Sequence, residues 1–291
     1  MANFKSKLKW RKWGLAALFI FICLIWYIIA GSDMRFSDKE IGDFFVNEKI
    51  DYSIHRVDFG SSELRYIETG LELDSAGTVI IFIHGAPGSS DAFHSYISDS
   101  VLLEKATLIA VDRPGYGYSD YGNPTVSIVD QAEAVMSIIN KIKARKIILV
   151  SHSYGCAIAG VIAVNLPDLV SANILVCPVI DPLNEKIFFF SSWPSLPIIK
   201  HLFSGAMQVS SFEKMNHADE LKSIEYLWSQ TKVPTVLFHG RQDWIAPIEN
   251  AYYLNDKISS EFLTVDLDDE ASHFILWKEQ DKIVQKIIEF L

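Results

Sequence analysis

A buried strand that turns directly into a helix is predicted at Lys146-Ile-Ile-Leu-Val-Ser-His-Ser-Tyr-Gly-Cys-Ala-Ile-Ala-Gly160. The uninterrupted apolar run from Ile147 to Val150 is typical of a strand that is covered on both faces. Small and helix-forming residues follow it at once. Such a sharp turn places its apex, Ser153, in a strained backbone conformation and crowds the positions two residues to each side. Ser151 and Gly155 are small enough to occupy those positions.

The composition of the 291 residues excludes several classes of protein. Hydrophobic residues make up 49% of the chain, which is enough for one large α/β domain with a sizeable core. The formal net charge is −10, and residues 1–13 contribute five positive charges and no acid, so the rest of the chain carries −15. Nucleic acid is not expected as a partner, because its binding needs basic patches. Strongly anionic substrates are disfavoured for the same electrostatic reason.

The three cysteines, Cys23, Cys156 and Cys177, do not form a disulfide pattern. Cys156 and Cys177 adjoin apolar runs, where a thiol usually behaves as a small buried hydrophobe. No cysteine or histidine spacing suggests a metal site. We therefore predict neither a metal nor a cofactor.

The N-terminus predicts a membrane anchor. Residues 14–32 carry no charge and reach the roughly 20 residues that a helix needs to span a bilayer. The basic residues 1–13 are expected to stay in the cytoplasm, which leaves the rest of the chain outside. A cleaved signal peptide is the alternative, but Ile29 is a poor residue at the third position before a cut after Gly31. We expect residues 33–50 to form a linker with a short helix, and residues 51–291 to form the main domain.

Apolar runs and turn residues predict the order of elements before the apex serine. Residues 53–59 and 64–69 read as an antiparallel hairpin at one edge of a sheet. Continuous apolar strands follow at 78–83 and 106–111, and residues 126–143 have helical periodicity. The first of these strands ends in His84-Gly85-Ala86-Pro87-Gly88, and the second in Asp112-Arg113-Pro114-Gly115.

Beyond the apex serine the chain continues as strands and helices, with one interruption. Strands are predicted at 173–177, 234–238 and 261–267, and a helix from Trp277 to the C-terminus. Residues 181–232 depart from this alternation and are rich in large apolar groups. They read as helices, either in a separate cover or in the main core.

Several of these motifs together resemble those of the α/β-hydrolase superfamily. The pattern small-x-Ser-x-small resembles its nucleophile elbow, although Ser151 replaces the usual glycine, and His84-Gly85 resembles its oxyanion loop. The resemblance implies a mostly parallel eight-stranded-type sheet flanked by helices, with a small helical lid at about 181–232. It also implies a triad of Ser153, Asp243 and His273, with the backbone N–H groups of Ala86 and Tyr154 as the oxyanion hole.

Some assignments remain open within this resemblance. Asp181 is an alternative acid, although Asp243 fits the spacing after its strand better. We expect His84 to be structural, and Asp112 and Arg113 to form an ion pair with each other. Glu213, Asp219 and Glu220 are the acids that could hold a substrate amine.

The resemblance implies an ester hydrolase with an apolar acyl or alkyl pocket for a small-molecule substrate, which the N-terminal run would anchor in a membrane. The alternatives are an amide or peptide hydrolase similar to prolyl aminopeptidases, and an acyltransferase. A binding protein that kept the fold without the activity belongs to a different class, but no triad residue is missing here. The sequence is silent on the oligomeric state.

Overall fold

The computed structural model describes Trp13, Leu18, Phe21, residues 33–73 and residues 77–291. Most of the predicted membrane anchor, and with it the basic N-terminus, therefore lies outside the described residues. Within the described part, no helix is both long and apolar enough to cross a membrane. The anchor at 14–32 stays a prediction.

Eight strands form one sheet in the order β1-β2-β4-β3-β5-β6-β7-β8. β1 and β2 form an antiparallel hairpin at one edge, β2 runs antiparallel to β4, and all other neighbours are parallel. The predicted mostly parallel sheet is confirmed. The bounds of the strands are β1 Tyr52–Phe59, β2 Ser62–Gly70, β3 Val79–Ile83, β4 Thr107–Val111, β5 Ile147–His152, β6 Val170–Val176, β7 Thr235–Gly240 and β8 Leu263–Asp268.

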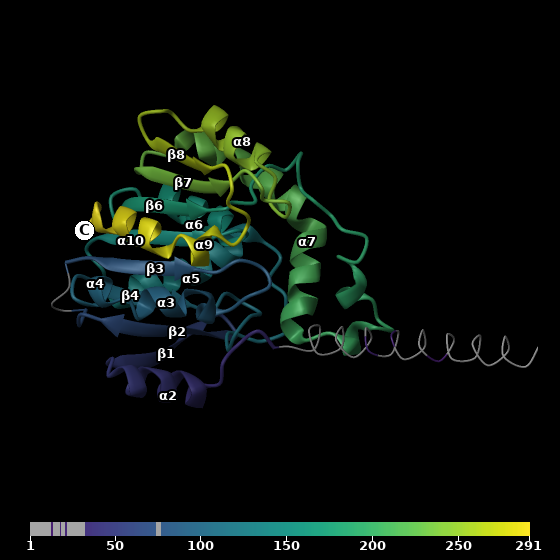
Figure 1. Ribbon diagram of the computed structural model, residues 1–291, viewed down its shortest axis with the longest axis horizontal. Coiled ribbons are helices and arrows are strands. Elements are labelled where there is room, and N and C mark those ends of the chain that lie inside the picture. The colour runs from purple at the N-terminus through teal and green to yellow at the C-terminus, as the bar shows by residue number, and fades with distance from the viewer. Residues whose placement is uncertain (1–12, 14–17, 19–20, 22–32, 74–76) are drawn as a thin grey trace, which may run out of the picture.

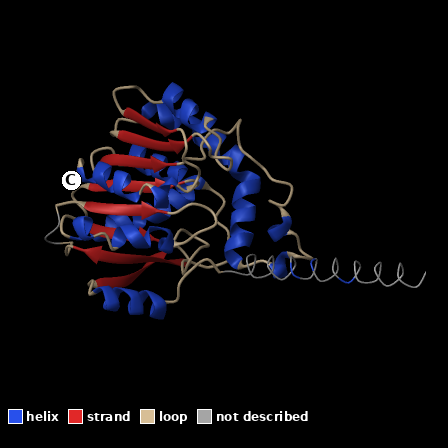
Figure 2. Ribbon diagram, viewed as in Figure 1, coloured by secondary structure: helices blue, strands red, loops and turns tan. Residues whose placement is uncertain are grey.

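Helices cover both faces of this sheet (Figure 2). On one face lie α5 (Ile128–Ile142), α6 (Gly155–Asn165) and α8 (Glu249–Lys257). On the other lie α2 (Asp38–Glu48), α3 (His94–Ile97), α4 (Ser100–Leu103), α9 (Ile275–Lys278) and α10 (Gln280–Ile288). The final helix predicted from Trp277 thus begins earlier and is divided into α9 and α10.

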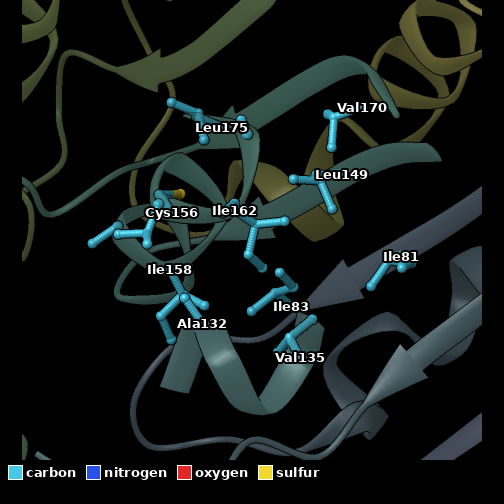
Figure 3. Packing of buried hydrophobic residues seen from close by; sticks show 14 of the residues in the cluster. Ile81, Ile83, Ala132, Val135, Leu149, Cys156, Ile158, Ile162, Val170 and Leu175 are labelled. Atoms are coloured by element: carbon cyan, nitrogen blue, oxygen red, sulfur yellow. The ribbon is translucent and has the colours of Figure 1, made fainter. Parts of the chain in front are cut away.

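The central strands are apolar throughout because both of their faces are buried. Ile81, Ile83 and Leu149 point toward α5 and α6, as Figure 3 shows. Ile80 and Phe82, which alternate with them along β3, pack into the cluster on the opposite face. Parallel strands in α/β proteins have this character because crossover helices cover each side.

The segment predicted as a linker, 33–50, contributes to the packed domain. Its helix α2 starts at a capping box in which Ser37 and Glu40 bond each other's backbone N–H groups. Ile41 and Phe45 are fully buried against the sheet. The predicted short helix is present, and its apolar side extends the core beyond the boundary at residue 51.

The chain between β6 and β7 contains α7 (Gly205–Ile224) and three 3-10 helices, η2 (Trp193–Ser195), η3 (Lys200–Leu202) and η4 (Glu225–Gln230). Figure 1 shows α7 beside one end of the parallel strands. The last part of this stretch, from Leu221 on, packs into the main domain. Leu221, Ile224 and Trp228 are buried in the main core next to α6. A helical cover is therefore formed by the residues before Leu221, and the remainder belongs to the core.

Gly155, the first residue of α6, lies against the end of β3. A Cβ atom there would lie 2.5 Å from the carbonyl oxygen of Ile83 and 2.6 Å from that of His84. We predict that Gly155→Ala lowers the free energy of unfolding by about 1–3 kcal/mol, because backbone atoms would have to move. Thermal unfolding measures the effect.

Gly77→Ala is the matched control, since nothing lies within 4 Å of a Cβ at that position. Equal stability of the two variants would show that the close approach of α6 to β3 is not required.

Candidate active site

Ser153 lies at the turn between β5 and α6. Its φ is +54°, in the left-handed region that residues other than glycine seldom adopt. The backbone is held there from both sides, because Ser153 N donates to Val176 O at 2.9 Å and Cys156 N donates to Ser153 O at 3.1 Å. Strain of this kind persists only where the surrounding packing enforces it. It lifts the Ser153 side chain out of the sheet.

The small residues of the pentapeptide are explained by their surroundings. Gly155 has no room for a side chain, as described above. Ser151 is fully buried, and its hydroxyl donates to Ile174 O at 3.3 Å. A serine is therefore accommodated where related elbows usually have glycine, because its polar atom has a partner on β6.

His273 and Asp243 complete a hydrogen-bonded chain with Ser153. His273 Nδ1 lies 2.7 Å from Asp243 Oδ2, and His273 Nε2 lies 3.1 Å from Ser153 Oγ. The carboxylate can only accept, so Nδ1 carries the proton and Nε2 is free to accept the hydroxyl proton of Ser153. The three residues predicted from the sequence are thus brought together in the order and geometry of a Ser-His-Asp triad.

The carboxylate of Asp243 is fixed by three groups. Its Oδ1 accepts from the backbone of Ile245 at 2.9 Å and of Ala246 at 2.8 Å, while Oδ2 faces His273. Burial acts to raise the pKa of Asp243, but the hydrogen bond from His273 and the charge of that ring outweigh it, so the pKa lies below its ordinary value. Asp243 is therefore ionised and can orient and stabilise a protonated His273.

Asp181, the alternative acid, has other partners. Its carboxylate accepts from the backbone of Leu183 at 2.9 Å and from the side chain of Asn184 at 2.7 Å. Within the part of the chain described, His273 bonds Asp243 and not Asp181. The choice that spacing favoured is the one that the geometry supports.

His152 is adjacent to the triad but stays neutral. Its Nε2 donates to His273 O at 3.1 Å, and its ring lies 4.8 Å from that of His273. Burial, followed by repulsion from His273, lowers the pKa of His152 to about 3. It therefore helps to hold the loop of His273 without competing for its proton.

The predicted oxyanion residues lie beside Ser153. A Cβ on Gly85 would lie 2.9 Å from Ser153 Cβ, so the loop after β3 passes directly over the serine. Ala86 and Tyr154 border the same pocket as Ser153. This placement is compatible with donation by their backbone N–H groups to a developing oxyanion, which stays a prediction.

His84 stabilises this loop. Its Nδ1 donates to Gly85 O at 2.7 Å, and its Nε2 accepts from the backbone of Arg113 at 3.1 Å. Burial and the nearby Arg113 charge hold the pKa of His84 well below its ordinary value. A neutral ring with one donor and one acceptor satisfies both contacts, which fits the structural role expected for it.

The expected ion pair between Asp112 and Arg113 is wrong. Asp112 Oδ2 instead accepts from Arg65 Nη1 at 3.0 Å. Arg113 pairs with Glu213 at 2.8 Å, across 100 residues of sequence. Neighbours in an extended stretch point to opposite sides, so that each side chain finds a partner on a different element.

Glu213 on α7 is the centre of a buried network. Besides the pair with Arg113, it accepts from Tyr116 OH at 2.6 Å and from Gln131 Nε2 at 3.0 Å. Arg113 Nη2 in turn donates to Gly85 O at 2.9 Å. The network joins the cover helix to the loop beside Ser153. It also occupies the Glu213 carboxylate, which is therefore not free to hold a substrate amine. No local sequence signal indicated this network.

Ser153 lies between two hollows. A cleft of about 550 Å³ extends along the loop after β3 toward residues 34–36, and a pocket of about 280 Å³ lies under α7. Ala86, Pro87, Ser153 and Ile245 border both. The walls of the pocket are mostly apolar and include Phe188, Phe190, Pro194, Met207 and Trp244. A substrate with groups on either side of a reacting carbonyl would fit this arrangement.

Two polar residues of the pocket wall, Lys214 and His217, both contact Glu185. Lys214 pairs with Glu185, and His217 Nδ1 lies 3.1 Å from Glu185 Oε2. Burial acts to raise the pKa of Glu185, but the hydrogen bond and charge of His217, with those of Lys214, outweigh it and lower the pKa. Because Glu185 offsets the charge of Lys214, the pocket is suited to an uncharged group.

One cluster could offer ligands to a metal within the described residues. Donor atoms of Cys177, Asp243 and His273 lie within 4.8 Å of one another. Asp243 and His273 already hydrogen-bond each other there. Two of the three donors therefore already serve the triad.

We predict that Glu213→Gln lowers the free energy of unfolding by about 3–5 kcal/mol, because it leaves the buried Arg113 without an anionic partner. Thermal unfolding of the detergent-solubilised chain tests this. Asp219→Asn, an exposed acid on the same helix, is the control. It should change stability by less than about 0.5 kcal/mol. Similar losses in both variants would contradict the role assigned to Glu213.

Comparisons with known proteins agree with this fold. Residues 78–196 match a family model described as the alpha/beta hydrolase fold. A 2-(acetamidomethylene)succinate hydrolase of Mesorhizobium japonicum is 31% identical over 121 residues, which are 42% of this chain and 41% of that protein. Protein ABHD8 of Homo sapiens is 24% identical over 246 residues, or 74% of this chain and 55% of that protein. The chain thus spans about half the length of these curated relatives.

Among solved structures, that of a membrane phospholipase A is similar, with a TM-score of 0.64 and 20% identity over 97% of both chains. The structure of an E-2-(acetamidomethylene)succinate hydrolase has a TM-score of 0.60, with 18% identity over 82% of this chain and 99% of that one. At this level of identity the likeness concerns the fold. With the family model that matches residues 78–196, the sheet order and the elbow, it shows that the chain has the α/β-hydrolase fold.

Proposed function

We propose that this protein is a membrane-anchored serine hydrolase that cleaves a carboxylic ester carrying an apolar acyl or alkyl group. The observation that carries the proposal is the aligned Ser153-His273-Asp243 chain between an open cleft and an apolar pocket. A serine at the elbow is a nucleophile for carbonyl carbon, and the pocket is suited to the apolar part of an ester.

The proposed reaction has two halves. In the first, Ser153 Oγ attacks the carbonyl carbon while His273 Nε2 takes the hydroxyl proton. His273 then gives that proton to the departing alcohol, and an acyl group remains on Ser153. In the second half, water attacks the acyl-enzyme with His273 again as the base, which releases the acid and restores the serine.

The backbone N–H groups of Ala86 and Tyr154 are the proposed donors to the oxyanion in both halves. Losing one such donor commonly raises the barrier by about 3 kcal/mol. The buried, ionised Asp243 stabilises His273 when it is protonated. Arg113 acts at a distance, because it holds Gly85 O and therefore the position of the loop.

The N-terminal sequence supports the proposed location. Residues 14–32 are long and apolar enough for an uncleaved anchor, and residues 1–13 are basic. We therefore propose that the N-terminus is cytoplasmic and that the catalytic domain lies outside.

Amide hydrolysis and acyl transfer use the same triad and are the remaining alternatives. The aminopeptidase reading needs an acid that is free to bind an amine. Glu213 is occupied by Arg113, Tyr116 and Gln131, and Glu220 accepts from the backbone of Ile128 at 3.1 Å. The third acid, Asp219, is exposed and lines neither of the two hollows beside Ser153. The ester reading is therefore the better supported one.

We predict that a fluorophosphonate probe labels Ser153 of the detergent-solubilised protein, because Ser153 is activated by His273. Labelling, mapped by mass spectrometry, should be lost in Ser153→Ala and in His273→Ala. Ser151→Ala is the matched control and should keep the label, since the Ser151 hydroxyl is buried and bonded to β6. A folded wild-type protein that takes no label would count against the proposal.

We also predict that kcat/KM for soluble esters rises with acyl length, by roughly threefold to fourfold per CH₂ while the chain fills the apolar pocket. Val179, which borders this pocket, is the site for a matched variant. Val179→Phe should shift the optimum to shorter acyl chains, whereas Val101→Phe on α4 should not. Faster turnover of prolyl amides than of all esters tested would favour the peptidase alternative.

A further inference from the structure

The segment that leads into α7 exposes a large apolar surface. Phe189 is 82% exposed and Ile198 is 91% exposed. These two belong to a group that we call the lid patch, whose members are Leu183, Ile187, Phe189, Phe190, Trp193, Leu196, Ile198 and Leu202. Single exposed apolar residues are ordinary, but such a dense set within 20 residues marks a surface that binds something.

The charge of this surface differs from that of the whole chain. No Asp or Glu occurs between Glu185 and Glu213, whereas Lys186, Lys200 and His201 lie within or beside the lid patch. Glu185 is buried and paired with Lys214. An acidic protein thus presents one apolar surface with a basic border, which is the combination that favours a membrane surface containing anionic lipids.

The described N-terminal residues lie next to this surface. Asp33 Oδ1 accepts from Tyr121 OH at 2.7 Å, and the Arg35 guanidinium stacks 3.8 Å from the centre of the Tyr121 ring. Tyr121 in turn lies against Gly205, where a Cβ would be 2.6 Å from its ring. Gly205 is the first residue of α7 and follows the lid patch directly. Residue 33, which follows the predicted anchor, is therefore held beside the end of the lid patch.

The same N-terminal residues border the catalytic cleft. Met34, Arg35 and Phe36 line the 550 Å³ hollow that contains Ser153 and His273. The backbone N–H of Phe36 donates to Asp91, which lines the cleft as well. If the anchor ends at residue 32, only one to three residues separate it from the side of the cleft that residues 34–36 line. Because an extended chain covers at most about 3.3–3.6 Å per residue, that side of the cleft must lie close to the bilayer surface.

We propose that the lid patch docks on the outer surface of the bilayer that holds the anchor, so that the cleft receives an amphiphilic ester directly from the membrane. The occupant is a lipid surface with anionic headgroups. The inference deepens the proposed function and rests on it for the anchor and for the ester. The docking itself can be measured without any turnover.

The first experiment measures contact with lipid. A Cys23→Ser background leaves only the buried Cys156 and Cys177. Ile198→Cys or, as the control, Val101→Cys is then added and labelled with an environment-sensitive thiol fluorophore. Val101 is an exposed residue of α4, which lies away from α7 in Figure 1. The full-length chains are reconstituted in phosphatidylcholine–phosphatidylglycerol vesicles, with or without bromine on the acyl chains.

Brominated lipid should quench most of the fluorescence at position 198 and leave that at position 101 unchanged. Absence of quenching at 198, or equal quenching at both positions, would overturn the proposal. Protection of position 198 from aqueous iodide without quenching by lipid would also overturn it, because a second copy or another protein would then cover the lid patch.

The second experiment measures the consequence for turnover. Phe189→Asp with Ile198→Asp should lower the hydrolysis of an ester embedded in vesicles by roughly tenfold or more, since each change removes apolar surface that would be buried in lipid and adds a negative charge. Val101→Asp should not. The wild type, the double variant and Val101→Asp should cleave a soluble short-chain ester in detergent at the same rate and take the fluorophosphonate label equally.

Equal vesicle turnover in the lid variant and the control would contradict delivery through the lid patch. A wild-type chain that takes no fluorophosphonate label and cleaves no ester, together with a labelled Ile198→Cys chain that brominated lipid quenches, would refute the proposed function and leave the docking intact. The two failures are therefore distinguishable.

Discussion

The close approach of α6 to the end of β3 is the constraint on which the rest of the site depends. Gly155 brings the helix against the backbone of Ile83 and His84, and Ser153, in the turn that leads to this contact, has a left-handed conformation. The strain has a structural purpose, since it raises the serine above the sheet edge where His273 can reach it. Strands buried on both faces make the turn rigid enough to hold this conformation.

A second constraint links the cover of the site to its catalytic loop. Arg113 is fully buried and binds Glu213 of α7, while the same guanidinium donates to Gly85 O. A buried ion pair of this kind contributes less to stability than its Coulomb energy suggests, but removing either partner is costly. The position of α7 over the pocket and that of the loop over Ser153 are thus set by one side chain.

The two hollows beside Ser153 differ in character and would hold different parts of a substrate. The pocket under α7 is mostly apolar and Glu185 offsets the charge of Lys214 on its wall, whereas the larger cleft runs toward the N-terminal residues. On the proposed function, the apolar part of an ester occupies the pocket, and the other part lies in the cleft near the membrane. An anchor beside the cleft would also raise the local concentration of substrate, because a lipid substrate and the enzyme would share one surface.

Sequence alone determined the elements whose signals are local. Apolar runs predicted the strands of the sheet, and small residues around Ser153 predicted the elbow. The order of Ser153, Asp243 and His273, each after a predicted strand, indicated the triad that the structure brings together.

Tertiary structure decided what depends on distant partners. Arg113 pairs with Glu213 and not with Asp112, Ile41 and Phe45 of the supposed linker fill the core, and the end of the predicted lid packs under α6. The physical reason is that strand and turn preferences act over a few residues, whereas the partner of a buried charge or apolar side chain is chosen by the packing of the whole chain.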